Sequence, residues 1–151
     1  NGIHTAIETN LNVSYEVAFP VLAQCDFIMC DFKIINEDKH LEYTGKSNRL
    51  IKENILHLPE LNTPFIVRTP VIPGVNDSIE EILSIGSFVS ELEGLLYYEL
   101  LPYHPLGLSK GTGENSFHSK KFEKPANEQM LALGKVLKKL PCDIRIAGQT
   151  I

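Results

Sequence analysis

Short apolar, β-rich runs alternate along the chain with stretches in which apolar residues recur every three or four positions. The apolar runs predict five strands, at residues 3–9, 27–33, 65–72, 95–104 and 143–147. The stretches between them predict four helices, at residues 15–24, 48–58, 78–92 and 127–140. Strands and helices that alternate at this spacing form right-handed βαβ units. We therefore expect an α/β fold with a parallel sheet, either open or part of a barrel.

The third predicted helix has the clearest boundaries. Ser78 and Glu81 have the spacing of a capping box at its start, and Gly94 is placed to end it. Pro20 lies inside the first predicted helix and is expected to kink or shorten it, because the proline ring clashes with the preceding turn.

Composition and charge exclude several classes of protein. The 151 residues include 14 basic and 19 acidic side chains, for a formal net charge of −5. Nucleic-acid binders need many Lys or Arg contacts to phosphate, so we expect no nucleic-acid partner. No apolar run approaches the roughly 18 residues of a membrane span. The three cysteines, Cys25, Cys30 and Cys142, do not form a disulfide framework, which favours a reducing cytoplasm.

Two further features concern the organisation of the chain. Residues 105–125 lack periodicity and carry several Gly and Ser residues, which predicts a flexible flap over a site. The chain starts at Asn1 and runs at once into a strand-like stretch, as expected of a piece of a larger protein. Such a piece has an open sheet edge at its first strand, through which two copies can pair.

Charged residues interrupt the second predicted strand, where a buried parallel strand is normally apolar. Met29, Asp31 and Lys33 alternate in this strand, so their side chains share one face. Burial of two unpartnered charges is costly, so Asp31 and Lys33 must pair with each other, bind a ligand or reach water. Both a structural ion pair and a binding site fit this pattern.

Other polar residues follow the ends of the remaining strands. Glu8 and Thr9 end the first strand, Arg68 lies in the third and His104 ends the fourth. Each of these alone has an ordinary explanation, such as an arginine that extends to solvent or a hydrogen-bonded edge histidine. Ligands of parallel α/β folds gather at the carboxyl ends of the strands, so together these residues predict a pocket rim. A zwitterion or a carboxylate suits such a rim, and a cation fits between Glu8 and Asp31.

Several familiar catalytic motifs are absent from the chain. There is no Walker loop, no GxGxxG, no nucleophile elbow and no zinc-type Cys/His spacing. A Schiff base on Lys33 is a further possibility, but Asp31 favours the charged ammonium over the neutral amine that this chemistry needs.

Five segments, taken in order, resemble a known family. GIHTAIETN, DFIMCDFK, HLEYTGKSN, VRTPVIPGVND and ELLPYHPLG are similar to motifs of the radical S-adenosylmethionine (SAM) enzymes that activate glycyl-radical enzymes, most of all those that act on pyruvate formate-lyase. The resemblance covers almost the whole chain. It implies that residues 1–151 are the C-terminal part of a (βα)6 partial TIM-type barrel.

The resemblance also implies a reaction. In this family a [4Fe–4S] cluster, held by a CxxxCxxC loop, reductively cleaves SAM to methionine and a 5′-deoxyadenosyl radical. The radical then removes a hydrogen atom from a glycine of the partner enzyme. By resemblance, Asp31 and Lys33 hold the methionine end of SAM, and Arg68 and His104 contact its nucleoside side. Glu8, Thr9, Met29 and Asp31 match positions that bind a monovalent cation.

The chain departs from the family pattern at several positions. CxxxCxxC is absent, as is the glycine-rich stretch that grips the SAM amino group, so this piece alone is expected not to cleave SAM. Glu8 stands where the closest relatives have aspartate, and Leu11 stands where glycine is usual. Two alternatives to an activase remain, namely a cluster-free small-molecule-binding domain and, less favoured, a Schiff-base lyase that uses Lys33.

Overall fold

The computed structural model describes residues 2–104 and 122–151. Within these ranges one sheet contains six strands in the order β1-β2-β3-β4-β5-β6. Their bounds are Ala6–Thr9, Phe27–Asp31, Phe65–Val71, Leu95–Pro102, Ile144–Ile146 and Gln149–Thr150. The first five strands are parallel, and β6 turns back antiparallel to β5.

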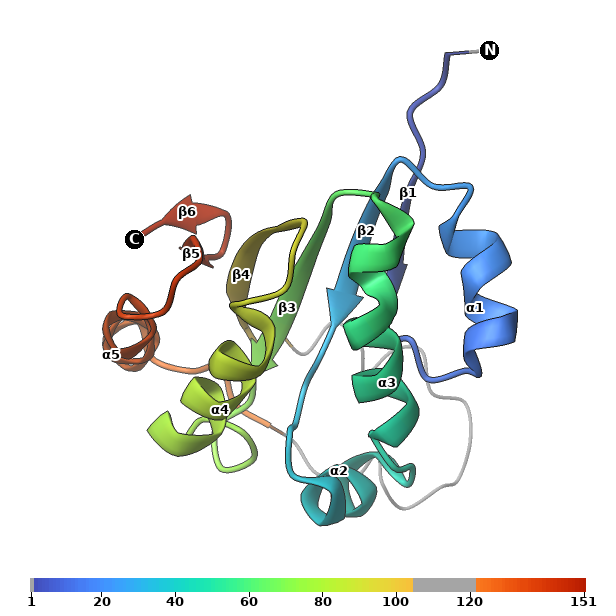
Figure 1. The fold of residues 1–151 in the computed structure, drawn as a ribbon. Coiled ribbons are helices and arrows are strands. Elements are labelled where there is room, and N and C mark those ends of the chain that lie inside the picture. The colour runs from blue at the N-terminus through green and yellow to red at the C-terminus, as the bar shows by residue number, and fades with distance from the viewer. Residues whose placement is uncertain (1, 105–121) are drawn as a thin grey trace.

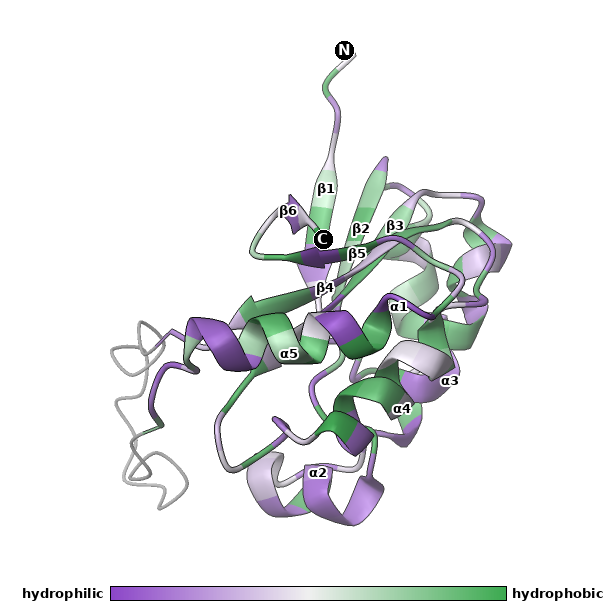
Figure 2. Cartoon of the chain, turned by 90° about the vertical axis from the view of Figure 1, so that its left-hand side faces the viewer, coloured by the Kyte–Doolittle hydropathy of each residue, from purple (hydrophilic) through white to green (hydrophobic). Residues whose placement is uncertain are grey.

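In the described part of the chain, five α-helices and one 3₁₀ helix connect the strands. The α-helices α1 to α5 span Tyr15–Leu22, Glu37–Thr44, Arg49–His57, Ile79–Val89 and Asn127–Leu137, and η1 spans Leu58–Leu61. The strands follow one another in chain order without a reversal, so right-handed connections place the helices on one side of the sheet. Figures 1 and 2 show this arrangement, with α2 beyond the carboxyl end of β2. The fold is the expected α/β array of parallel βα units, as in part of a barrel.

The two faces of the sheet differ in polarity. The helix-covered face is apolar, and Ile28, Phe65, Val67, Tyr98 and Leu100 on it are fully buried. The opposite face, here called the open face, carries the alternate residues of each strand, whose burial is mostly intermediate. The residues on the open face include Glu8, Met29, Asp31, Arg68, Tyr97, Glu99 and Arg145. The charged residues of the strands therefore lie opposite the main core.

Several predicted boundaries need correction. The first strand begins only at Ala6, and the helix that contains Pro20 ends at Leu22. Ser78 caps α4 by accepting a hydrogen bond from the Glu81 N–H at 3.2 Å. The Glu81 carboxylate accepts instead from the N–H of Ile35 at 2.6 Å, so only one half of the expected capping box forms. Helix α2 and strand β6 were not predicted.

Two other expectations concern segments rather than boundaries. The flexible flap expected at residues 105–125 falls mostly on residues 105–121, which lie outside the described residues. In the part of the chain that the structure describes, no helix is both long and apolar enough to cross a membrane.

Candidate functional site

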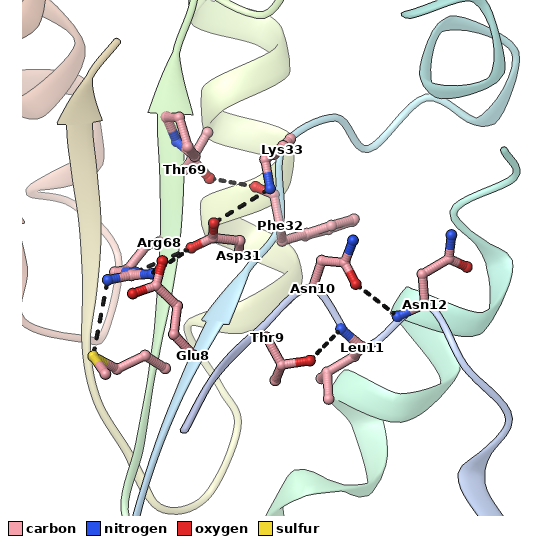
Figure 3. A network of polar contacts seen from close by, with 12 residues as sticks. Glu8, Thr9, Asn10, Leu11, Asn12, Asp31, Phe32, Lys33, Arg68 and Thr69 are labelled. Carbon is pink, nitrogen blue, oxygen red and sulfur yellow. Dashed lines mark hydrogen bonds and ion pairs between the residues drawn. The ribbon is translucent and has the colours of Figure 1, made fainter. Parts of the chain in front are cut away.

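Three strands bring one charged side chain each to a common point on the open face. Arg68 of β3 lies opposite Asp31 of β2, and its Nε and Nη2 both donate to Asp31 Oδ1, at 3.0 and 2.8 Å. Nη2 also contacts Oε1 of Glu8 on β1 at 2.7 Å (Figure 3). Burial lowers the pKa of Arg68, but the hydrogen bonds and negative charges of Glu8 and Asp31 outweigh this and raise it. Arg68 is therefore a permanent cation between two carboxylates.

Lys33 completes this network just beyond the end of β2. Its Nζ lies 3.3 Å from Oδ2 of Asp31, while 36% of its side chain stays exposed. Met29 shares the face, as expected from the alternation, with its sulfur 3.8 Å from Nη1 of Arg68. The sequence predicted that five residues come together. This holds for Glu8, Asp31, Lys33 and Arg68, but His104 forms no hydrogen bond or ion pair with them among the described residues.

Buried side chains hold the backbone that carries Lys33. Thr69 donates its hydroxyl to the carbonyl of Phe32 at 2.7 Å, and Asn76 Nδ2 donates to the carbonyl of Lys33 at 2.7 Å. Asn48 Nδ2 donates to the next two carbonyls along the chain, at 2.8 and 3.0 Å. Thr69, Asn76 and Asn48 are all fully buried. Since this segment has left the sheet, these bonds replace the ladder bonds that it lacks and fix its path.

Sequence reasoning missed these supporting residues, although a signal was present. Asn48 ends the segment HLEYTGKSN, and Asn76 is the second-last residue of VRTPVIPGVND. Both segments were singled out only for their resemblance to a family. A buried asparagine usually has its amide hydrogen-bonded. Both side chains donate through Nδ2 to two carbonyls each, and Asn76 Oδ1 also accepts from the N–H of Ile72, whereas Asn48 Oδ1 has no partner among the described residues.

The loop that leaves β1 is fixed in a similar way. Asn54 of α3 donates to the carbonyls of Leu11 and Val13, at 2.9 and 2.7 Å, and Thr9 Oγ1 accepts from the N–H of Leu11 at 3.0 Å. Leu11 has a φ of 55°, in the left-handed region that favours glycine, and its side chain is buried in the core. The glycine of the resembling family therefore matches the backbone conformation at this position.

A small pocket adjoins the network at the ends of β1 and β2. Its volume is about 220 Å³, and the residues that line it are Asn10, Asn12, Asp31, Lys33, His40, Thr44, Lys46 and Ile51. Whole-ligand pockets usually measure about 300–1,000 Å³. This pocket therefore accommodates one end of a ligand of SAM's size, with Lys33 as a cation in its wall.

The position of His104 and the partner of the Glu8 and Asp31 carboxylates differ from those expected from the sequence. His104 follows β4 by two residues, is exposed, and makes no hydrogen bond or ion pair within the described ranges. The register places Arg68 opposite Glu99, so His104 lies five residues further along the chain than that pair, beyond the end of β4. The carboxylates of Glu8 and Asp31, expected to flank a metal cation, here flank the guanidinium of Arg68.

The cysteines do not fit an iron–sulfur cluster. Cys30 is fully buried on the helix-covered face, where burial and the charge of Asp31 raise the pKa of its thiol. Cys25 follows α1, and Cys142 precedes β5. All three thiols are free. Across residues 2–104 and 122–151 no three His, Cys, Asp or Glu side chains are grouped as metal ligands. The residues that the structure describes therefore supply no ligand set for a cluster.

Comparison with known proteins identifies relatives of one kind. No protein-family model matches the chain. It is 46% identical over 111 residues, 72% of its length, to 4-hydroxyphenylacetate decarboxylase activating enzyme of Clostridioides difficile strain CD196. It is 34% identical over 116 residues, 73% of its length, to pyruvate formate-lyase-activating enzyme of Staphylococcus epidermidis. These matches cover 35% and 46% of the two relatives, so the chain spans less than half of either.

A solved structure has the same fold over nearly the whole chain. It is a domain of pyruvate-formate lyase-activating enzyme from Bacteroides vulgatus, with a TM-score of 0.78 and 26% sequence identity. The match covers 97% of this chain and 83% of that domain. A domain with this arrangement of βα units therefore exists as a defined structure in another protein.

Proposed function

We infer that this chain, which is homologous to glycyl-radical-enzyme activating enzymes, is the C-terminal, SAM-binding portion of such an enzyme. The observation that carries the proposal is the network of Glu8, Arg68, Asp31 and Lys33 at the carboxyl end of the sheet. Lys33 is the half-exposed cation of this network and lies in the wall of a pocket. A sheet with charges paired on one face and an accessible ammonium at its end suits a zwitterionic ligand.

Three residues of the network, together with His104, have a part in binding SAM. The ammonium of Lys33 pairs with the carboxylate of the methionine end, and Asp31 orients that ammonium through its Oδ2. Arg68 and His104 contact the nucleoside side. Asn76, Thr69 and Asn48 fix the backbone at Lys33 before the ligand binds. Binding therefore loses little conformational entropy in this segment.

SAM supplies a 5′-deoxyadenosyl radical when it is reductively cleaved, and this radical takes a hydrogen atom from a glycine of the partner. The cysteines of this chain do not fit the [4Fe–4S] cluster that the family uses as reductant. We therefore expect the 151-residue chain to bind SAM without cleaving it. Activity requires the cluster-binding part of the full-length protein.

The proposed partner is a glycyl-radical enzyme, with pyruvate formate-lyase first and 4-hydroxyphenylacetate decarboxylase second among those that the relatives activate. The three free thiols support a reducing, cytoplasmic location.

We further propose that a monovalent cation binds beside Glu8, Thr9, Met29 and Asp31 when the SAM carboxylate arrives. This cation competes with Arg68 for carboxylate oxygens, so its binding shifts the guanidinium.

The proposal is tested on the full-length protein, expressed and reconstituted without oxygen. Incubation with SAM and dithionite should yield 5′-deoxyadenosine, detected by mass spectrometry, and a glycyl radical on pyruvate formate-lyase, detected by electron paramagnetic resonance. An intact cluster without 5′-deoxyadenosine would overturn the proposal. A full-length protein that binds SAM but holds no cluster would favour a cluster-free binding domain instead. The ion pair of Lys33 with Asp31, at 3.3 Å, suits the binding of an anionic group rather than a Schiff base.

A further inference from the structure

The sheet carries a second charged group on the open face, away from Lys33. The register aligns Asp31, Arg68, Glu99 and Arg145 on four successive strands, β2 to β5, so that acidic and basic residues alternate across the sheet. Strands lie about 4.8 Å apart, which places Arg145 about 14 Å from Asp31. The first pair of this row forms the network described above. The SAM site proposed above does not include the second pair, Glu99 and Arg145.

Glu99 and Arg145 do not pair with each other, although they are neighbours in register. Among the described residues no ion pair within 4.0 Å involves either of them, and the buried Glu99 carboxylate accepts from the N–H of Gly148 at 2.6 Å. The guanidinium of Arg145 lies instead over the ring of Tyr97, with its carbon 3.7 Å from the ring centroid. Its Nε is buried and has no hydrogen-bond partner. Arg145 is thus a cation stacked on Tyr97, and its Nε–H donor is unpaired within the described residues.

We propose that Arg145, supported by Tyr97, binds the oxygen acceptors of an extended peptide, namely the segment of the glycyl-radical enzyme that carries the reactive glycine. This inference rests on the proposed function. The glycine must reach the SAM site near Asp31 and Lys33. An extended chain advances about 3.3 Å per residue, so a residue about four positions from the glycine reaches Arg145 across the open face.

The chemistry of the two side chains fits such a partner. Arginine has donors and no acceptor, so it recognises peptide carbonyl and carboxylate oxygens. Arginine and tyrosine are also the residue types that most often anchor protein interfaces, because each combines apolar area with hydrogen bonding. Stacking on Tyr97 fixes the plane of the guanidinium before the peptide arrives, which lowers the entropy lost on binding.

The test uses the full-length, reconstituted protein and two fluorescein-labelled peptides, centred on the radical-bearing glycines of pyruvate formate-lyase and 4-hydroxyphenylacetate decarboxylase. Fluorescence anisotropy gives the Kd of each peptide in the presence of SAM. Arg145→Gln should weaken binding of the better peptide at least about tenfold, and Arg145→Lys should weaken it less. Arg49→Gln, which removes an exposed arginine from α3, is the matched control and should leave the peptide Kd unchanged.

The SAM affinity of the same proteins separates this inference from the proposed function. Arg145→Gln should leave the SAM Kd, measured by calorimetry, within about a factor of two. Wild-type peptide affinity in Arg145→Gln would overturn the inference, as would a lack of peptide binding by a wild-type protein that binds SAM. Failure of the wild-type protein to bind SAM would instead contradict the proposed function. If Arg145→Gln does not fold, Arg145→Lys decides, and unchanged peptide binding by Tyr97→Leu would then also count against the inference.

Discussion

Arg68 binds Asp31 through two nitrogens and one carboxylate oxygen, Oδ1, which leaves Oδ2 of Asp31 for Lys33. One carboxylate thus orients two cations of different mobility. The Arg68 side chain is only 12% exposed and is fixed, whereas Lys33 is three times as exposed and can approach a ligand. This division of roles explains why a strand end can carry so much charge and still be ordered.

Removal of Arg68 should destabilise the fold far more than neutralisation of Glu8. Arg68→Leu leaves the Asp31 and Glu8 carboxylates facing each other without a cation, which should lower the free energy of unfolding by about 3 kcal/mol. Glu8→Gln removes a contact from a side chain that is 61% exposed, so its effect should stay below about 1 kcal/mol. Urea denaturation followed by circular dichroism measures both values. Equal effects of the two substitutions would contradict the described network.

At Leu11 a glycine variant should be more stable than an alanine variant, which is the reverse of the usual order. Its positive φ costs a non-glycine residue about 1–2 kcal/mol, while its buried side chain contributes about 2–5 kcal/mol relative to alanine. Leu11→Gly relieves the backbone but loses the packing, and Leu11→Ala loses the packing and keeps the strain. We expect stability to fall in the order wild type, Leu11→Gly, Leu11→Ala. Urea denaturation tests this order, and a glycine variant less stable than the alanine variant would refute it.

Asp26 should make part of the stability dependent on pH. The backbone N–H of Thr5 and then its hydroxyl donate to Asp26 Oδ2, at 2.7 and 3.0 Å, and lower the pKa of this carboxyl. A carboxyl whose pKa is depressed by folding stabilises the protein above its unfolded-state pKa of about 3.9 and loses this effect as the pH falls through the folded-state value. The stability difference between wild type and Asp26→Asn should therefore shrink between pH 7 and pH 3.

Denaturation of Glu53→Gln, which changes an exposed carboxyl on α3, provides the control for Asp26. Its difference from wild type should be small at both pH values. A stability difference for Asp26→Asn that is the same at pH 7 and pH 3 would show that the charge of Asp26 does not contribute.

Strand β1 should allow the 151-residue chain to associate with itself. It is the outermost strand of the described sheet next to β2, and Ile3, before it, is 75% exposed. An unpaired strand edge pairs readily with another chain, and a lysine on such an edge opposes this pairing. Size-exclusion chromatography with light scattering should show a dimer at high concentration that Ala6→Lys weakens. A strictly monomeric wild-type chain would contradict the expectation.

The convergence of Glu8, Asp31, Arg68 and Lys33 could be predicted because parallel strands present their carboxyl ends at one edge, whatever their exact bounds. Helix α2 could not be found from hydrophobic periodicity, since its only aliphatic residue, Leu41, is exposed. Its capping residues did carry a signal. Asn36 accepts from the N–H of Lys39, and Gly45 ends the helix with a φ of 72°.

The other misses have their own physical causes. Strand β6 follows a turn in which both Ala147 and Gly148 have positive φ, at 48° and 82°, and alanine gives no sign of this conformation. Glu99 lies within an apolar stretch and Arg145 within a strand of only three residues, so neither was predicted as a site residue. Their alignment with Asp31 and Arg68 depends on the register of four strands, which no local pattern encodes.

The most direct measurement is the affinity of the full-length protein for SAM with and without the ammonium of Lys33. Calorimetry on Lys33→Ala should show binding weaker by about 1.5–3 kcal/mol, the usual contribution of a hydrogen bond to a charged group. Lys39→Ala, which removes a half-buried lysine from α2, should bind SAM as the wild-type protein does. Wild-type affinity in Lys33→Ala would contradict the assignment of this strand end as the SAM site.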